Sequence, residues 1–327
     1  MGRKPAYFFI SVSSRQNLDL CIKYALAGFT DSINGLWTFL DIQIGDYVSF
    51  LYGAKAYNLY VVESKQAILN SEKLPPWSPI KFKQSGKVYC FPFRLQLKPV
   101  RRFEESLVKA EFNYIAENLL LRGGHYRTHF QADQTTLQAA SQMGVLWNDR
   151  VESMMFSEDH IFIPKFSKNR KALSRPKVFR FQELILQAAV RQHLSTGDIL
   201  QNLLDSTGLD LRADNLEVLG EKVLPEGHVD ILIKEAHPMG MARKIILGVK
   251  AGVAQRKDIK QIEIYASEIG RECVLGILLT RHISKKLHKE AAEKNVKVLS
   301  CCFKDSDLLT KPVSFDELLG SLDITTL

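Results

Sequence analysis

The sequence predicts an α/β protein, α+β overall, with a curled β-sheet or barrel domain first and a mixed sheet flanked by helices second. The chain has 327 residues, which is more than one typical domain. Short apolar runs between turn residues fill its first third and are typical of strands, whereas strands and helices alternate in its last part. Hydrophobic residues at 46% and charged residues at 24% exclude a disordered, collagen-like or membrane chain.

The charge of the chain favours a polyanionic partner. Lys and Arg number 44 against 36 Asp and Glu, a formal net charge of +8, so nucleic acid is the first partner to test. No window reaches the ~18 apolar residues of a membrane span, and the start of the chain lacks the features of a signal peptide. We expect a cytoplasmic protein without a membrane partner. Its five cysteines include no C-x-x-C pair and are expected to be free thiols.

The first part of the chain predicts a small domain built on a curled, mostly antiparallel sheet. Apolar runs that alternate with polar residues or are bounded by glycine and proline indicate its strands. In order, we expect a strand at 6–12, a helix at 16–27, a Gly-Leu-Trp element at 35–37, strands at 47–52 and 57–62, a proline-bounded loop at 74–79 and a strand at 88–100. The domain is expected to close near residue 103.

A connecting region follows. Helical spacing covers 104–121 and ends at the glycines 123–124, and a weaker helical pattern lies within 131–160. Residues 161–180 contain seven Lys or Arg, no acidic residue, and the prolines Pro164 and Pro176. This stretch is either a solvated linker or an arm that follows phosphates.

The last part of the chain has the element order of a mixed sheet covered on both faces. A helix at 181–194 comes first. Then come strands at 216–223, 228–234 and 244–250, a helix at 257–269, a strand at 274–280, a helix at 284–293 and a strand at 296–302.

Three short motifs in this part carry chemistry: Gly227-His228-Val229-Asp230, Gly248-Val249-Lys250, and Gln261 with Tyr265 four residues later. Strand side chains repeat their direction every two residues, so an Asp on one strand and a carboxylate-x-Lys on the next bring three polar groups to one sheet edge. In a metal nuclease the carboxylates bind Mg²⁺ and the lysine stabilises charge on the phosphate. Each residue also has a purely structural explanation. Asp230 could cap a turn, Lys250 could be a surface lysine, and Gln261 and Tyr265 could share a helix face through packing alone. His228 is interpreted as pointing to the opposite face of its strand from Asp230, as a packing or surface residue.

In these motifs, over residues 178–303, the chain resembles the RecB-like PD-(D/E)XK nucleases, a restriction-endonuclease-like fold. The resemblance implies that Asp230 is a metal ligand for Mg²⁺ or Mn²⁺ and that Lys250 is the catalytic lysine. It implies that Gln261 and Tyr265 orient the site or the DNA backbone, and that Glu183 is the acidic residue of the first helix.

Position 248 departs from that family. The motif expects a metal-binding Glu there, and Gly248 offers no side-chain oxygen. Three accounts are open: an inactivated version of an active enzyme, which we favour; a silent nuclease fold kept for binding; or a carboxylate relocated to Glu263, Glu217 or Glu221.

Aromatic residues near loops mark the first domain, which over residues 6–103 resembles the EVE/YTH group of PUA-like domains. The resemblance rests on the opening aromatic strand, the Gly-x-Trp element, the Gly45-Asp46 turn, the Trp-containing loop and the closing strand. It implies a pocket for a flipped, modified base. Trp37 and Trp77 are the cage candidates, with Tyr7, Ser11 and Tyr52 as lining. Lys81, Lys83, Lys87, Arg94, Lys98, Arg101 and Arg102 are expected either to contact phosphates or to form a solvated rim.

Together these features predict a modification-dependent restriction endonuclease that acts on double-stranded DNA. Residues 1–110 would read the modified base, 111–177 would connect, and 178–327 would be the nuclease domain. A homodimer is expected because cutting both strands needs two active sites. The alternatives are a nucleic-acid-binding protein with a silent nuclease fold and a repair nuclease.

Overall fold

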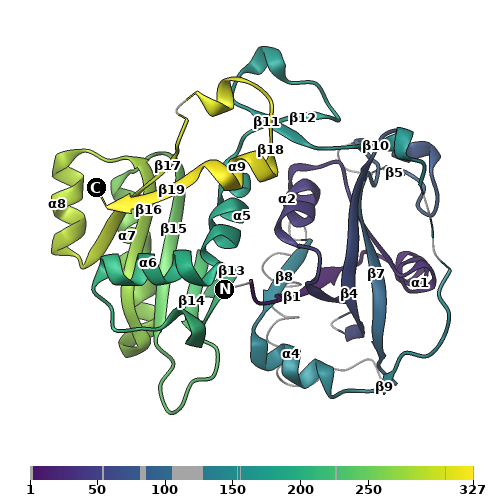
Figure 1. The fold of residues 1–327 in the computed structure, drawn as a ribbon, viewed down its shortest axis with the longest axis horizontal. Helices are drawn as coiled ribbons and strands as arrows, with labels where there is room; N and C mark the ends of the chain where they lie inside the picture. Colours follow the sequence, from purple (N-terminus) through teal and green to yellow (C-terminus); the bar gives the residue numbers. More distant parts are fainter. Residues whose placement is uncertain are drawn as a thin grey trace. The chain divides into compact units, whose positions relative to one another are not determined.

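The structure is a computed structural model that describes residues 3–53, 55–81, 86–104, 128–152, 154, 156–224, 227–305 and 307–326. The helix predicted at 104–121 lies outside these residues except for its first position. The chain forms two compact units, one of Pro5–Pro164 and one of Lys165–Leu327 together with residues 1–4 (Figure 1). The predicted connector is therefore divided between the two units. Its residues 128–164 belong to the first unit, and its residues 165–177 belong to the second.

The first unit is built on a mixed but mostly antiparallel sheet, as predicted. Its strand order is β2-β7-β4-β3-β1-β8, and the β1–β3 pair is parallel while the other pairs are antiparallel. The strands are β1 (Tyr7–Ser11), β2 (Leu26–Phe29), β3 (Tyr47–Tyr52), β4 (Lys55–Ile68), β7 (Phe93–Arg102) and β8 (His129–Ala132), with β9 (Val145–Leu146) on β7 and β10 (Ile161–Phe162) on β4. The short strands β5 (Ile80–Lys81) and β6 (Val88–Tyr89) pair separately.

Three α-helices in the described part of this unit begin at side-chain caps. Ser14 caps α1 (Arg15–Tyr24), Ser32 caps α2 (Ile33–Asp41) and Asp133 caps α4 (Gln134–Ser141). The predicted Gly-Leu-Trp element is thus part of a helix, because the Ser32 hydroxyl accepts a hydrogen bond from the Gly35 amide at 3.1 Å and starts α2. Short 3₁₀ turns lie at Ser71–Lys73 and Glu158–His160.

The second unit is built on a six-stranded mixed sheet of order β13-β14-β15-β16-β17-β19. The strands are β13 (Leu216–Leu224), β14 (Gly227–Glu235), β15 (Lys244–Val253), β16 (Cys273–His282), β17 (Val296–Phe303) and β19 (Leu322–Thr326). The β15–β16–β17 pairs are parallel and the others antiparallel. A small sheet of β11 (Lys165–Ser167), β12 (Val178–Arg180) and β18 (Val313–Ser314) completes the unit.

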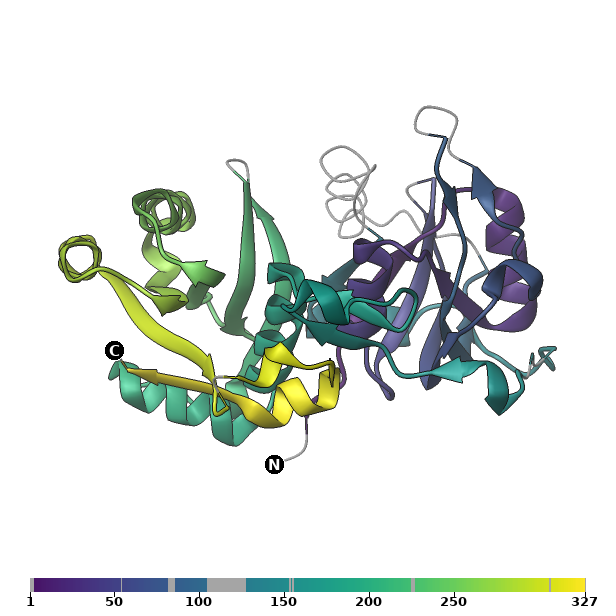
Figure 2. The same cartoon turned by 90° about the horizontal axis from the view of Figure 1, so that it is seen from above.

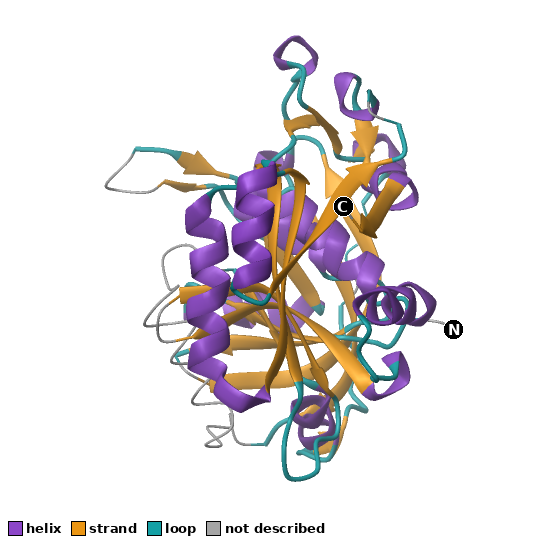
Figure 3. Cartoon of the chain, turned by 90° about the vertical axis from the view of Figure 1, so that its left-hand side faces the viewer, coloured by secondary structure: helices purple, strands orange, loops and turns teal. Residues whose placement is uncertain are grey.

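Helices cover both faces of the six-stranded sheet. Apolar residues of α7 (Arg256–Ile269) and α8 (Lys285–Glu293) pack on one face with β16 and β17, and Figure 3 shows the helices on this side lying along the strands. On the other face lie α5 (Glu183–Leu194) and α6 (Gly197–Thr207), as Figures 1 and 2 show, and α9 (Phe315–Ser321) packs against α5. Further 3₁₀ turns lie at Arg170–Ala172, Ala213–Asn215, Gly270–Glu272 and Leu308–Thr310. The sequence did not predict α6, α9, β18 or β19.

The described part of the chain has neither a long apolar helix nor a disulfide. It contains no helix that is both long and apolar enough to span a membrane. The five cysteines all lie in it and are free thiols, with Cys21 and Cys301 buried.

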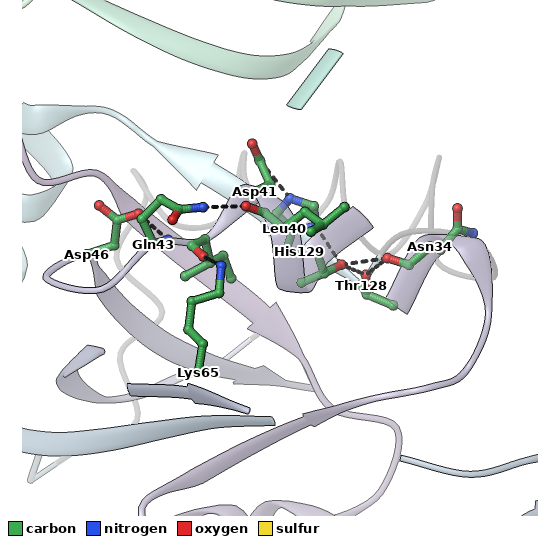
Figure 4. Close-up of polar contacts among 10 residues, drawn as sticks. Asn34, Leu40, Asp41, Gln43, Asp46, Lys65, Thr128 and His129 are labelled. Carbon is green, nitrogen blue, oxygen red and sulfur yellow. Dashed lines mark hydrogen bonds and ion pairs between the residues drawn. The ribbon is translucent and has the colours of Figure 1, made fainter. Parts of the chain in front are cut away.

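A buried polar network joins β8 to α2 in the first unit (Figure 4). The His129 Nε2 atom lies 3.0 Å from Asp41 Oδ2, and its Nδ1 atom lies 2.9 Å from the Thr38 hydroxyl. The Thr38 hydroxyl also contacts that of Thr128. These residue types occur in nucleophilic triads, but Thr38 is fully buried and cannot reach a substrate. We therefore assign the network to the stability of the first unit.

Replacement of His129 tests this assignment. His129→Leu removes a buried hydrogen bond to the Asp41 carboxylate, so the free energy of unfolding of the first unit is expected to fall by about 2–4 kcal/mol. Urea unfolding followed by tryptophan fluorescence measures it, because Trp37, Trp77 and Trp147 all lie in this unit. The control is His160→Leu, since the His160 side chain is only half-buried. An equal loss in both variants would contradict the assignment.

Candidate functional site

A pocket in the second unit collects most of the residues that the sequence singled out. It lies where β14, β15 and the first turns of α7 meet. Its polar lining is His228, Asp230, Lys250, Asp258, Gln261 and Tyr265, and Gly248 and the apolar residues Val229, Ile246, Leu247, Ile262 and Leu278 complete it. The predicted group of Asp230, Gly248, Lys250, Gln261 and Tyr265 is thus brought together; its catalytic role remains a prediction.

The strand register explains why Asp230 faces position 248. In the antiparallel β14–β15 pair, Ile231 lies opposite Leu247. Asp230 precedes Ile231 and Gly248 follows Leu247, so these two residues lie beside each other. The Asp230 Oδ2 atom accepts a hydrogen bond of 2.7 Å from the Val249 amide. This bond fixes the carboxylate at the edge of the pocket.

Lys250 is the only lysine or arginine among the residues that line this described pocket, and carboxylates surround it. Its Nζ atom donates to Glu183 Oε1 at 3.0 Å and lies 3.9 Å from Asp258 Oδ1. Burial by itself would lower the pKa of Lys250, but the negative charges of Asp230, Glu183 and Asp258 outweigh burial and raise it. Lys250 is therefore a fixed cation at neutral pH.

Glu183 reaches the pocket from another element. It is the first residue of α5, where the helix dipole favours a negative charge. Its second oxygen, Oε2, accepts a hydrogen bond of 3.2 Å from the Ala251 amide. The Glu183 carboxylate thus binds both the side chain of Lys250 and the backbone amide of Ala251.

Gln261 and Tyr265 form one pair on α7. The Gln261 Nε2 atom donates to the Tyr265 hydroxyl at 2.6 Å. A Cβ atom at Gly227 would lie 2.3 Å from that hydroxyl oxygen, and Gly227 has φ +152°, which side chains rarely adopt. The close approach of Tyr265 therefore explains the glycine three residues before Asp230.

Position 248 points into the pocket. A Cβ atom on Gly248 would lie 3.2 Å from Cδ1 of Ile262 and 3.6 Å from Cδ1 of Leu278. Both contacts are the ends of flexible side chains, so a larger residue needs Ile262 to move by only a few tenths of an ångström. A glutamate at this position would add its carboxylate to the pocket.

The residues present do not fit the Mg²⁺ or Mn²⁺ site that the sequence implied. Divalent cations need several free oxygen ligands. Asp230 is engaged by the Val249 amide, Glu183 by Lys250, and Asp258 by the Gln255 amide in the capping box of α7. Within the described ranges, no three His, Cys, Asp or Glu residues are placed to hold a metal ion.

None of the three relocated carboxylates lines the pocket. Glu263 makes an ion pair with Lys294, and Glu217 makes one with Lys234 at 2.9 Å. The strand register places Glu221 opposite Asp230, yet Glu221 is absent from the pocket lining that the structure describes. The extra carboxylate is instead Asp258, which the sequence analysis missed; its signal is the Gln255-x-x-Asp258 capping pattern at the start of α7.

The interpretation of His228 is corrected by the structure. Residues two apart on a strand share a face, and His228 lines the pocket together with Asp230. The sequence signal for this was available, because the two residues are both in the Gly-x-x-Asp motif.

A second pocket lies in the first unit and contains two of the five predicted base-pocket residues. Ser11 and Trp77 line it, together with Ile10, Val12, Ser13, Asn17, Cys21, Ala27, Gly28, Phe50 and Phe91. Trp77 is held by its neighbours. Its ring centroid lies 5.6 Å from that of Phe91, and a Cβ atom on Gly28 would come within 2.4 Å of its ring. Gly28 therefore makes room for the tryptophan.

Trp37, Tyr7 and Tyr52 do not line this pocket. Tyr7 is fully buried, its hydroxyl lies 2.8 Å from that of Ser49, and burial raises its pKa. Trp37 lies in α2 and packs edge-on against His129, with ring centroids 4.5 Å apart. A cage of Trp37 and Trp77 is thus not formed. The polar groups that sequence reasoning missed are Ser13 and Asn17, which lie at the start of α1.

The basic residues that were predicted to contact phosphates in the first unit lie in different environments. Arg94 is only 1% exposed and donates to the backbone oxygens of Phe91 and Pro75, and burial lowers its pKa to about 10. The predicted phosphate contact of Arg94 is therefore wrong. Its buried guanidinium instead lies over the Trp77 ring, 5.5 Å from the ring centroid. Arg102 pairs with Asp149 at 2.7 Å, and Arg101 donates to the Met143 oxygen. Lys81, Lys87 and Lys98 are exposed, and Lys83 lies outside the described residues.

Comparisons with known proteins give only distant likenesses. No protein-family model matches the chain, and no curated protein matches it. Among solved structures, the chain is similar to a repair endonuclease from Pyrococcus abyssi with 16% identity and a TM-score of 0.23, over 30% of this chain and 43% of that one. It is similar to an EndoMS–dsDNA complex with 10% identity and a TM-score of 0.25, over 91% and 97% of the chains. It is also similar to the DNA modification-dependent restriction endonuclease AspBHI with 12% identity and a TM-score of 0.21, over 84% and 63%. The match thus spans less than half of the Pyrococcus enzyme, and TM-scores of this size do not establish a shared fold.

The charge balance around Lys250 gives a direct test. Glu183→Gln removes the negative charge 3.0 Å from Lys250 Nζ, so the pKa of Lys250 is expected to fall. An NMR titration of ¹³C-labelled lysine side chains measures it. The control is Glu290→Gln, which breaks the separate ion pair with Arg256 and should leave the pKa of Lys250 unchanged. An unchanged pKa in Glu183→Gln would show that Glu183 does not hold the lysine.

Proposed function

We propose that this chain is a modification-dependent DNA endonuclease whose cleavage site lacks one carboxylate. The first unit would bind a flipped, modified base, and the second unit would engage the phosphodiester backbone of double-stranded DNA. The observation that carries the proposal is the convergence of Asp230, Lys250 and position 248 on one pocket.

The second unit supports the cleavage part of the proposal. Hydrolysis of a phosphodiester builds negative charge on the phosphate, and a preorganised cation stabilises that charge. Lys250 is such a cation, since Glu183 fixes its position and neighbouring carboxylates keep it charged. Asp230 lies on the adjacent strand β14, and a second carboxylate at position 248 of β15 would complete a pair of metal ligands.

The pocket at Trp77 supports the recognition part. An extruded base is held by stacking on aromatic rings and is identified by hydrogen bonds to its edge. Trp77 and Phe91 supply aromatic surface, and Ser11, Ser13 and Asn17 supply polar groups. The net charge of +8 favours binding to the phosphates of DNA. A homodimer would supply the two active sites needed to cut both strands.

A second candidate function is binding without cleavage. It is favoured by the poor fit of the pocket to a divalent cation, because Gly248 offers no ligand and the carboxylates present are engaged by Lys250 and by backbone amides. On this account the chain would hold modified DNA and leave it intact.

Restoring the carboxylate separates the two candidates. Gly248→Glu is expected to gain Mg²⁺-dependent cleavage of duplexes that carry a modified base, measured by gel electrophoresis of end-labelled DNA. The size-matched control, Gly248→Gln, and the double variant Gly248→Glu/Lys250→Met should both stay inactive. Absence of cleavage in Gly248→Glu, with retained binding, would favour the binding protein, and equal cutting of unmodified DNA would favour a repair nuclease.

Removal of Trp77 tests the base pocket. Stacking of one base on an aromatic ring contributes about 1–3 kcal/mol, so Trp77→Ala is expected to weaken binding of a modified duplex by about 5- to 150-fold. Binding of the unmodified duplex should change little. Fluorescence anisotropy with full-length protein measures both affinities.

Two further variants guard this test against misfolding. Asn17→Ala removes a polar group of the same pocket without emptying a packed site, and it should also reduce the preference for modified DNA. Trp147→Ala removes an indole outside the pocket and should leave the preference intact. If Trp77→Ala and Asn17→Ala both keep the wild-type preference, the base is not read in this pocket.

A further inference from the structure

The basic segment, defined here as residues 165–180, is an ordered part of the second unit. It runs through β11, the 3₁₀ turn at Arg170–Ala172 and β12. The two strands pair in parallel, and β11 also pairs with β18. The Lys165 amide donates to the Lys177 oxygen at 2.8 Å, and the Asn169 side chain caps the 3₁₀ turn by accepting from the Lys171 amide at 3.0 Å. The segment is thus preorganised and does not behave as a linker.

The basic segment presents its charges outward. Phe166 and Phe179 are buried and face the interior of the unit. The exposed basic residues are Lys165, Lys168, Arg170, Lys171, Arg175, Lys177 and Arg180, and the segment contains no acidic residue. Of these, Lys165 has Glu317 as an electrostatic neighbour. A dense positive surface of this kind is unfavourable by itself and is stabilised when a polyanion covers it.

Arg281 extends this surface toward the candidate pocket. Lys250 on β15 lies opposite Thr280 on β16, so Arg281 is the next residue at the same end of the sheet. Arg281 also lies close enough to Lys168 to act on it electrostatically, and partial desolvation of the Lys168 ammonium group together with that positive charge lowers the pKa of Lys168. Among the described residues, neither Lys168 nor Arg281 makes an ion pair. Two like charges are therefore held near each other without a compensating carboxylate.

The chemistry of the surface favours nucleic acid over a protein partner. Protein interfaces have an apolar and aromatic core with few charges. No large hydrophobic residue of the basic segment is exposed, and its three arginines offer planar donors suited to phosphate.

We propose that the basic segment and Arg281 form the surface by which the second unit binds the phosphate backbone of duplex DNA. This inference rests on the proposed function in taking DNA as the partner, and it adds a binding surface outside both pockets. The contacts would be independent of sequence and modification, since phosphates carry neither.

The triple variant Arg170→Gln/Lys171→Gln/Lys177→Gln tests the surface. Binding of full-length protein to modified and unmodified duplexes is measured over a range of salt concentrations. Each lost phosphate contact lowers the slope of log K against log salt by about 0.9, so the slope should become less steep by about 2–3. Both duplexes should lose affinity by the same factor.

A matched control is available in the same unit. Lys285→Gln/Lys286→Gln/Lys289→Gln removes the same charge from exposed positions on α8, and it should keep the wild-type slope. The thermal midpoints of both triples should equal that of the wild type, because the replaced side chains are exposed.

The outcomes separate this inference from the proposed function. If the two triple variants change the slope equally, net charge alone governs binding, and if neither changes it, the replaced residues contact no phosphate; either result overturns the inference. If the basic-segment triple lowers the slope while the wild type ignores base modification, the surface stands and the base-reading proposal fails. If modified DNA is preferred but the triple keeps the wild-type slope, base reading stands and the surface fails. No duplex binding at low salt would overturn both.

Discussion

The charge balance at Lys250 is the constraint on which the second unit depends. One ammonium group meets carboxylates from α5, β14 and α7, so it joins three elements that are distant in the sequence. Those carboxylates share one positive partner and also accept hydrogen bonds from backbone amides, so each of them is engaged without a metal ion. A further carboxylate at position 248 would add to the excess of negative charge over the single lysine, and a divalent cation would offset it.

Two glycines shape the two pockets in the same way. Gly28 makes room for the ring of Trp77, and Gly227 makes room for the hydroxyl of Tyr265. In both cases a single methyl group would push an aromatic side chain out of place. Gly248 is different, since a side chain there meets only the flexible ends of Ile262 and Leu278. The first two glycines are required by packing, whereas the packing around the third tolerates a side chain.

The sequence predicted the second unit better than the first. Its strands are apolar runs bounded by breakers, and the two-residue period of strands was enough to bring Asp230 and Lys250 together. Asp258 was missed because its place depends on how α7 begins, and His228 because its strand face was assigned wrongly. Arg94 shows a deeper limit. The local sequence does not distinguish a buried arginine from a surface arginine. Only the tertiary structure shows that Arg94 donates to backbone oxygens in the interior.

The chain enters the second unit twice. Lys4 donates to the backbone oxygen of Leu216 at 3.4 Å and to that of Asp214, and the first unit then runs without interruption from Pro5 to Pro164 before the second resumes. In topological terms the first unit is an insertion in the second. It could therefore be exchanged as a cassette at its two proline borders, with every described strand pairing of the second unit kept, so that the same six-stranded sheet could carry different inserted units.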